Sequence, residues 1–321
     1  GSLPGRDLTN QGQFHAWTNS LPLVRWILAY DLVADAFPFD PAFHEKAARA
    51  FLGYAERLLW PVARSRVQTG DNQFFSVVLG CYMIGLMFGQ RRFGSALGRE
   101  MADYATRRLE DAVGHLPPGG YSAEGYYHNQ VVATLACLYG AIQEGLTGRR
   151  LFEHSHKPNG ISLRDILTVD YLTILPGGLM VPWDASYYHP AHVKMNLAYL
   201  ARQTGDAQFL GPIRRYRLFE GDPRPGWGRD DDAWTWFWWP DSVRRMEDIP
   251  DEAPPNWARD RVAFGLIECN GETGILQNFD ESHRRDSPAA SRAQSDPNNL
   301  VAIGRGAPLI LDGGFAKAPP E

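Results

Sequence analysis

The chain has few cysteines and little net charge. Only three of its 321 residues are cysteines, and Cys81, Cys137 and Cys269 lie far apart in the sequence. An odd number with no CxxC pair excludes a disulfide scaffold and a zinc cluster held by cysteines. The formal net charge is −5, from 32 basic and 37 acidic residues. Since nucleic-acid-binding proteins usually carry a basic patch, this balance argues against nucleic acid as a partner.

Long apolar runs and several common motifs are also missing. No run reaches the roughly 18–20 residues that a membrane-spanning helix requires, and no secretory signal is visible at the start of the sequence. The sequence contains no phosphate-binding GxGxxG or GxxxxGK[ST] loop, no GxSxG hydrolase motif and no HExxH zinc motif. We therefore expect neither a membrane nor a nucleotide as a partner.

The first 220 residues or so show the periodicity of successive helices. Asp40-Pro41 is a typical helix start, with aspartate as the N-cap and proline at the first helical position, and Pro61 marks the end of that helix. Mostly apolar helices alternate with amphipathic ones, which is typical of an α/α toroid and also occurs in large irregular α-domains. The predicted helices cover 17–36, 41–59, 72–88, 95–112, 124–144, 163–175 and 189–203.

From about residue 257 the pattern changes to short strands: the first alternates, the second is short and apolar, and the last two flank a hairpin-like turn at 304–306. These are expected over 261–268, 273–279, 299–303 and 308–311. About four strands are too few for a closed sandwich of the usual size. The predicted fold is therefore mainly α: an incomplete (α/α) toroid over residues 1–250, followed over 251–321 by a β-sheet domain, the truncated start of an antiparallel β-sandwich.

Two polar segments stand at the starts of otherwise apolar predicted helices. The first contains the triplet Asp71-Asn72-Gln73. An N-cap role for Asp71 or Asn72 would explain one residue of the triplet, but not all three. The second contains Glu124-Gly125-Tyr126-Tyr127-His128. A helix start with exposed polar residues is the alternative explanation for this second segment.

Asn72 and Tyr127 together suggest a reaction. In a toroid the starts of inner helices converge on one face of the cavity, so these two side chains would lie near each other. The amide would bind the carboxylate of a uronic acid and make the C5 proton removable, and the phenol would transfer protons. Such a β-elimination requires no metal or cofactor.

The order and spacing of several segments resemble the heparinase II/III-like polysaccharide lyases, a family that includes heparin, heparan and oligoalginate lyases. The resemblance implies an (α/α) toroid with a C-terminal β-sandwich, and an acidic polysaccharide or oligosaccharide as the substrate. It also implies a periplasmic or secreted protein, with a cytoplasmic location as the alternative. The segments are 26–31 with 37–40, then 71–73, 124–128, 177–184 and 306–314.

The resemblance also implies roles for individual residues. Asn72, with Gln73, would bind the carboxylate, and Tyr127 would be the catalytic acid and base. His128 and Glu124 would support Tyr127 by hydrogen bonds. Further residues are candidates for contact with the sugar. Core packing explains the aromatic ones at least equally well, and a plain helix turn is the favoured explanation of the histidine. They are Trp183, Tyr187, Tyr188, His189 and the aromatic cluster 234–239.

The sequence departs from the family in two places, and other functions stay open. Gln73 stands where many members have histidine, and 292–298 lacks a histidine that many members carry there. Asp312 matches a zinc ligand of some members without its histidine partners, so we expect no structural metal in the β domain. The alternatives are a glycoside hydrolase on the same toroid, with Asp184 or Glu124 as the acid, and a non-catalytic carbohydrate-binding relative.

Overall fold

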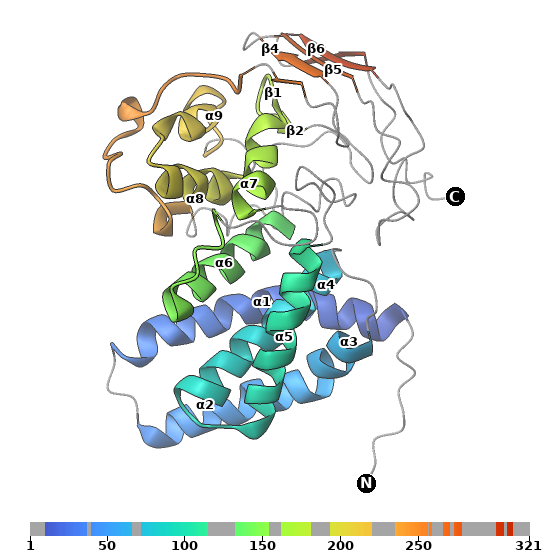
Figure 1. The fold of residues 1–321 in the computed structure, drawn as a ribbon, viewed down its shortest axis with the longest axis vertical. Coiled ribbons are helices and arrows are strands. Elements are labelled where there is room, and N and C mark those ends of the chain that lie inside the picture. The colour runs from blue at the N-terminus through green and yellow to red at the C-terminus, as the bar shows by residue number, and fades with distance from the viewer. Residues whose placement is uncertain are drawn as a thin grey trace. The chain divides into compact units, whose positions relative to one another are not determined.

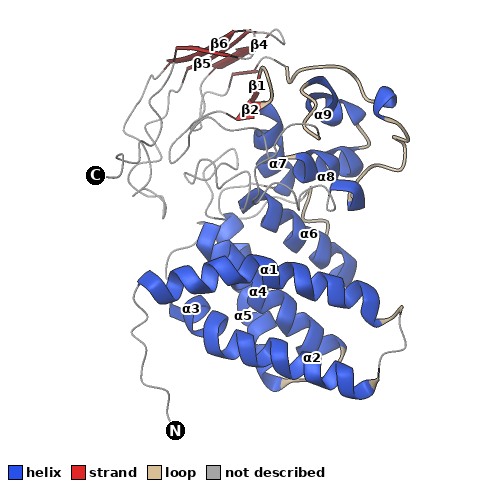
Figure 2. Ribbon diagram, turned by 180° about the vertical axis from the view of Figure 1, so that it is seen from behind, coloured by secondary structure: helices blue, strands red, loops and turns tan. Residues whose placement is uncertain are grey.

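The structure, a computed structural model, is mostly helical over the part of the chain that it describes, as the sequence predicts (Figures 1 and 2). The chain divides into two compact units, Gly1–Val113 and Gly114–Glu321. These units are defined by compactness. The boundary near residue 250 that the sequence predicts separates a helical from a β domain, and it stays a prediction. The described residues are 10–36, 40–65, 72–114, 132–153, 162–180, 193–219, 235–255, 257–258, 266–269, 273–277, 300–304 and 307–310.

The first unit is a group of helices packed around α4. Every residue of α4 except Gln73 is buried, and the helix packs against α1, α2 and α3. Two π-helical turns, η1 (Ala55–Leu59) and η2 (Leu86–Arg91), continue α2 and α4. The α-helices of this unit are α1 (Asn10–Ala34), α2 (Pro41–Tyr54), α3 (Trp60–Ser65), α4 (Asn72–Gly85) and α5 (Ala96–Gly114).

The start of α2 is as predicted, but its continuation is not. Asp40 Oδ1 accepts a hydrogen bond from the N–H of Ala42 at 2.9 Å, and Pro41 opens the helix. The prediction that the helix ends before Pro61 is wrong, because η1 leads directly into α3. A proline ring clashes with the carbonyl four residues earlier in a regular α-helix. The wider π turn just before Pro61 gives the ring room.

Small residues bring the end of α4 very close to α5. A Cβ placed on Gly85 would lie 2.5 Å from the carbonyl oxygen of Gly98 and 2.6 Å from the nitrogen of Ala102. A Cβ on Gly89, in η2, would lie 2.4 Å from the nitrogen of Arg99. Only hydrogen fits at these glycines, so backbone approaches backbone at this crossing.

The stretch Asn72–Arg91 passes a length and composition test for a membrane-spanning helix. It has 20 residues, with a mean hydropathy of 1.4, and 89% of its most apolar window is buried inside the protein. It is the one such stretch among the described residues. Polar residues interrupt its apolar runs, which is why a search for uninterrupted runs misses it. The core helix of a soluble protein passes the same test, so the finding is weak evidence for a membrane.

The helices of the second unit include α6 (Thr134–Thr147), α7 (Leu163–Leu172), α8 (Lys194–Thr204) and α9 (Gly211–Arg215). A capping box between Ser162 and Asp165 starts α7. The predicted extension of α7 to residue 175 is wrong: β1 (Ile174–Leu175) instead pairs with β2 (Leu179–Met180). The hairpin turn contains Gly177 and Gly178 at φ of 83° and 73°, a conformation that favours glycine.

Five short strands after residue 256 form one antiparallel sheet in the order β3-β4-β5-β6-β7. Four of them lie where the sequence predicts strands, and β3 adds a fifth. Strand β6 pairs on both sides, with β5 and β7. The mainly α fold with an antiparallel sheet is thus confirmed, whereas the toroid and the sandwich stay predictions. The strands are β3 (Trp257–Ala258), β4 (Leu266–Cys269), β5 (Thr273–Gln277), β6 (Leu300–Gly304) and β7 (Ala307–Ile310).

Candidate functional site

Two of the predicted site residues, Asn72 and Gln73, lie at the start of α4. The structure thus describes where these two residues lie, whereas their proximity to the remaining predicted site residues stays a prediction. Those remaining residues are outside the described part of the chain: Glu124, Tyr127, His128, Trp183, Tyr187, Tyr188 and His189.

The side chain of Asn72 is buried and incompletely paired. The residue is 1% exposed, and its main-chain oxygen accepts a hydrogen bond from Ser76 Oγ at 2.7 Å. Its side-chain oxygen, Oδ1, is also buried but has no hydrogen-bond partner among the residues that the structure describes. Leaving a buried acceptor unpaired costs about 1–3 kcal/mol, so its presence requires an explanation.

An N-cap role does not explain Asn72. The side chain of an N-cap residue accepts a hydrogen bond from a backbone N–H two or three residues further on. Asn72 is the first helical residue of α4, and its Oδ1 accepts no such bond within the described part of the protein. Asp71, the other candidate for the cap, lies outside the described residues. The amide of Asn72 is therefore available to a group other than its own helix.

The start of α4 favours an anion. The N-terminus of a helix carries a partial positive charge and N–H groups without a helical acceptor. The first turn of α4 contains no acidic residue, and Asp71 directly precedes it in the sequence. Half-buried Gln73 adds a second amide beside Asn72. An amide pair at a positive helix end is suited to bind a carboxylate.

A second buried asparagine lies in the second unit and is fully paired. Asn196 in α8 donates from Nδ2 to Asp170 Oδ2 at 2.6 Å, and its Oδ1 accepts from Thr134 Oγ1 at 3.1 Å. Asp170 and Asn196 are 0% exposed. The three residues come from α7, α8 and α6, so the network joins three helices. The sequence does not predict this pairing, although polar residues at apolar helical positions mark its members.

The cysteines that the structure describes are poor nucleophiles. Cys81 and Cys137 are both buried, and burial raises the pKa of each thiol. The carboxylate of Asp170 raises the pKa of Cys137 further. A cysteine reacts as its thiolate, so these two residues belong to the core. Within the described residues, no group of three His, Cys, Asp or Glu side chains is placed to hold a metal ion.

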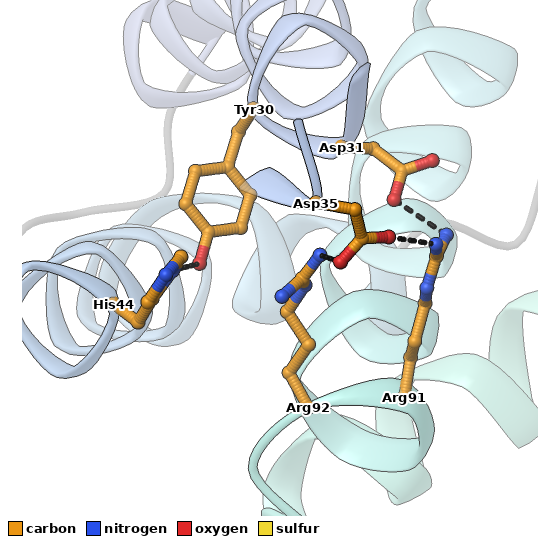
Figure 3. A network of polar contacts seen from close by, with 6 residues as sticks. All are labelled: Tyr30, Asp31, Asp35, His44, Arg91 and Arg92. Carbon is orange, nitrogen blue, oxygen red and sulfur yellow. Dashed lines mark hydrogen bonds and ion pairs between the residues drawn. The ribbon is translucent and has the colours of Figure 1, made fainter. Parts of the chain in front are cut away.

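A polar cluster at the end of α1, part of the segment that resembles the lyase family, fastens α1 to its neighbours (Figure 3). Hydrogen bonding to Arg92 holds the pKa of Asp35 below its ordinary value, and burial raises the pKa of Tyr30. The ion pairs are largely exposed, so the cluster is a tether between helices. Its contacts are Tyr30 Oη–His44 Nδ1 at 2.8 Å, Arg91–Asp31 at 2.5 Å, Arg91–Asp35 at 2.9 Å and Arg92–Asp35 at 2.6 Å.

No family model matches the chain, and no curated protein matches it in sequence. The resemblance to heparinase II/III-like lyases therefore stays a prediction from the sequence segments. The buried, unpaired side-chain oxygen of Asn72 is independent of that resemblance, because it follows from the packing of the first unit.

Proposed function

We propose that the protein is a polysaccharide lyase that cleaves a uronate-containing polysaccharide or oligosaccharide by β-elimination. The observation that carries the proposal is Asn72, whose side-chain oxygen is buried and unpaired within the described residues. A substrate carboxylate accepts hydrogen bonds only, so it would pair with this amide when the NH₂ group, after a half-turn of the side chain, takes the place of the oxygen. The resemblance in sequence supports the same residue for the same role.

The amide of Asn72 fits a carboxylate or a carboxylic acid. Its two ends have nearly the same shape, so a half-turn of the amide exchanges Oδ1 and Nδ2 at one position. The NH₂ group then donates to a carboxylate oxygen, and the positive end of α4 adds to the attraction. During the reaction negative charge grows on the carboxylate, so the hydrogen bond strengthens in the transition state.

Residues assigned from the resemblance carry out the remaining steps of the proposed reaction. Tyr127, deprotonated, removes the proton from C5 of the uronate. The electron pair forms a C4–C5 double bond, and the bond from C4 to the glycosidic oxygen breaks. The leaving oxygen takes a proton, for which Tyr127 is again the donor. His128 and Glu124 orient the phenol, and the proposed reaction needs no cofactor.

We also propose the finer fold: helices arranged as an incomplete (α/α) toroid, and a sheet that begins a β-sandwich. The alternation of buried α4 with amphipathic neighbours in the first unit supports the toroid. The antiparallel order of β3 to β7 supports the sandwich. A periplasmic or secreted location follows from the same resemblance.

The direct test is the formation of an unsaturated uronate, whose double bond absorbs in the ultraviolet. Alginate, heparan sulfate, hyaluronan and glucuronan are incubated with the wild-type protein, and absorbance and new reducing ends are recorded together. Both signals are expected to rise with at least one polymer. Reducing ends without absorbance would indicate a glycoside hydrolase, and binding without either signal a non-catalytic relative.

Tyr127→Phe tests the catalytic assignment. The substitution removes one hydroxyl, and a general acid–base group contributes about 10²–10⁴ in rate. We expect turnover to fall by that factor, with an unchanged circular dichroism spectrum. Tyr54→Phe, which removes a hydroxyl from α2, is the control and should leave turnover as it is. Activity of Tyr127→Phe within about twofold of the wild type would contradict a role of this size.

A further inference from the structure

The stretch 247–255 in the second unit has the composition of a linker between domains. It contains four acidic residues and three prolines, and strand β3 begins at Trp257, two residues after its end. Boundaries between domains usually fall in exposed, flexible segments of this kind. The structure instead shows this stretch in contact with α9, through its main chain as well as its side chains.

Arg214 in α9 binds two main-chain carbonyl groups of the stretch. Its Nη1 donates to the carbonyl oxygen of Glu247 at 2.9 Å and also to that of Ile249. These carbonyls lie at the end of the short 3₁₀ turn η5 (Met246–Asp248), where main-chain oxygens lack a helical donor. Hydrogen bonds from a charged donor are among the stronger ones in proteins. One guanidinium therefore joins the end of η5 to α9.

Two apolar side chains anchor the same stretch. Ile249 is 1% exposed, and Pro254 is also buried. The four acidic residues at 247, 248, 251 and 252 are all exposed. Removing apolar side chains from water stabilises the arrangement that buries them. Buried apolar residues between exposed charges indicate a segment that lies on the protein surface, and a linker in solvent would bury neither.

The main chain of the stretch lies directly on the start of α9. A Cβ placed on Gly211 would lie 2.7 Å from the carbonyl oxygen of Glu252, so only hydrogen fits there. Arg215 Nη1 donates to the carbonyl oxygen and to Oδ1 of Asp251, both at 3.4 Å. Burial, and then the carboxylate of Glu252, raises the pKa of Tyr171 in α7 to about 12, so the stretch also lies near α7.

We infer that Met246–Pro254 is a clasp, a segment that fastens the chain to α9 just before the sheet begins, and that Arg214 keeps it closed. When the hydrogen bonds from Arg214 are lost, the clasp opens as a local unit while the helices of the second unit stay folded. The sheet is then joined to the helices by a flexible connection. The inference rests on these contacts alone and is independent of the proposed reaction.

The experiment is limited proteolysis of the full chain with a glutamate-specific protease. The clasp offers it two exposed glutamates, Glu247 and Glu252, and cleavage requires the main chain around them to open. Mass spectrometry follows cleavage at each glutamate, and a synthetic peptide covering 244–256 gives the rate for an open chain. We expect the wild type to be cut at these sites at least about tenfold more slowly than the peptide.

Two variants open the clasp by different routes. Arg214→Ala removes the donor of both hydrogen bonds and should raise the cleavage rate at Glu247 and Glu252 at least about tenfold. Gly211→Ala should raise it as well, because the new methyl group displaces the carbonyl oxygen of Glu252. Arg244→Ala is the matched control: it removes an exposed arginine two residues before the clasp and should be cut at the wild-type rate.

Cleavage at Glu144, within α6 of the second unit, reports unfolding of the helices and separates it from opening of the clasp. The inference requires that Arg214→Ala and Gly211→Ala be cut in the clasp well before Glu144. It is overturned if the wild type is cut as fast as the peptide, or if neither variant is cut faster than the wild type. It is also overturned if Arg244→Ala is cut as fast as Arg214→Ala, or if the clasp and Glu144 are cut together in both clasp variants.

Discussion

Helices α4 and α8 are the buried helices of two different units, and each has a buried asparagine in its first turn. Asn72 is 1% exposed and Asn196 is 0% exposed. The side chain of Asn196 uses both ends of its amide, toward Asp170 and Thr134. The side-chain oxygen of Asn72 has no partner in the described part of the protein.

The comparison separates two reasons for burying an amide. A fully paired amide joins neighbouring helices and contributes to a specific core, as in the network of α6, α7 and α8. A buried amide oxygen without a partner costs free energy. For Asn72 we propose a ligand as the missing partner. Burial alone does not distinguish a structural from a functional asparagine, so the hydrogen-bond partners are the more informative observation.

The largest effect on stability is expected at Gly85, where the backbones of α4 and α5 leave no space for a side chain. In Gly85→Ala the new methyl group meets the backbone of Gly98 and Ala102 at 2.5 and 2.6 Å, so we expect unfolding free energy to fall by about 3 kcal/mol. Gly145→Ala in α6 is the control, because nothing lies within 4 Å of its Cβ, and it should gain about 0.5–1 kcal/mol. Urea denaturation measures both. Equal stability of Gly85→Ala and the wild type would contradict the close crossing.

The next effect concerns the paired asparagine. Asn196→Ala removes the Nδ2 donor from the buried carboxylate of Asp170, and a hydrogen bond to a charged group contributes about 1.5–3 kcal/mol. We expect a loss of that size in unfolding free energy. Thr134→Ser keeps the hydroxyl that donates to Asn196 Oδ1 and should cost much less. If Asn196→Ala were no less stable than Asn72→Ala, the distinction between the two asparagines would fail.

The smallest effect concerns the exposed tether at the end of α1. The hydrogen bond from Arg92 lowers the pKa of Asp35 in the folded protein below its ordinary 3.8. A lowered folded-state pKa stabilises the protein above the unfolded value, and this contribution disappears as pH falls through the folded-state pKa. We expect Asp35→Asn to lower the melting temperature slightly at neutral pH.

The pH dependence of that difference is the measurement. Thermal unfolding of Asp35→Asn and the wild type should differ at neutral pH and converge below pH 3.8. Glu45→Gln, which breaks an exposed pair with Arg49 at 3.0 Å within α2, is the control. Its effect should be smaller, because an isolated exposed pair contributes little. A difference that grew as the pH fell would have the wrong sign.

Local features of the fold could be predicted from sequence. Asp40-Pro41 starts α2 because its chemistry is confined to neighbouring residues. Strands β4 to β7 follow from local alternation, a short apolar run and the glycine-containing turn at 304–306. Prediction failed where the secondary structure depends on small changes of helix geometry or on pairing with another strand. Pro61 is accommodated by a π turn, and Ile174–Leu175 pairs with β2 instead of extending α7.

The candidate site shows the same limit. The triplet at 71–73 could be singled out because polar residues precede an apolar helix. Whether Asn72 caps that helix could not be decided from sequence, since the answer depends on where Oδ1 lies. Polar residues at apolar helical positions mark Thr134, Asp170 and Asn196, but their pairing with one another could not be predicted, because they are separated along the chain and meet only when three helices pack.

The most direct test of the central claim is Asn72→Ala, measured in parallel for kcat and for unfolding free energy. Gln90→Ala, which removes an exposed amide from the other end of the same helical stretch, is the control. The account predicts that kcat on the cleaved uronate polymer falls about 10²-fold or more, as when an oxyanion donor is removed, with no loss of stability. Unchanged kcat together with a loss of about 1 kcal/mol in stability, the cost of a missing cap, would contradict it.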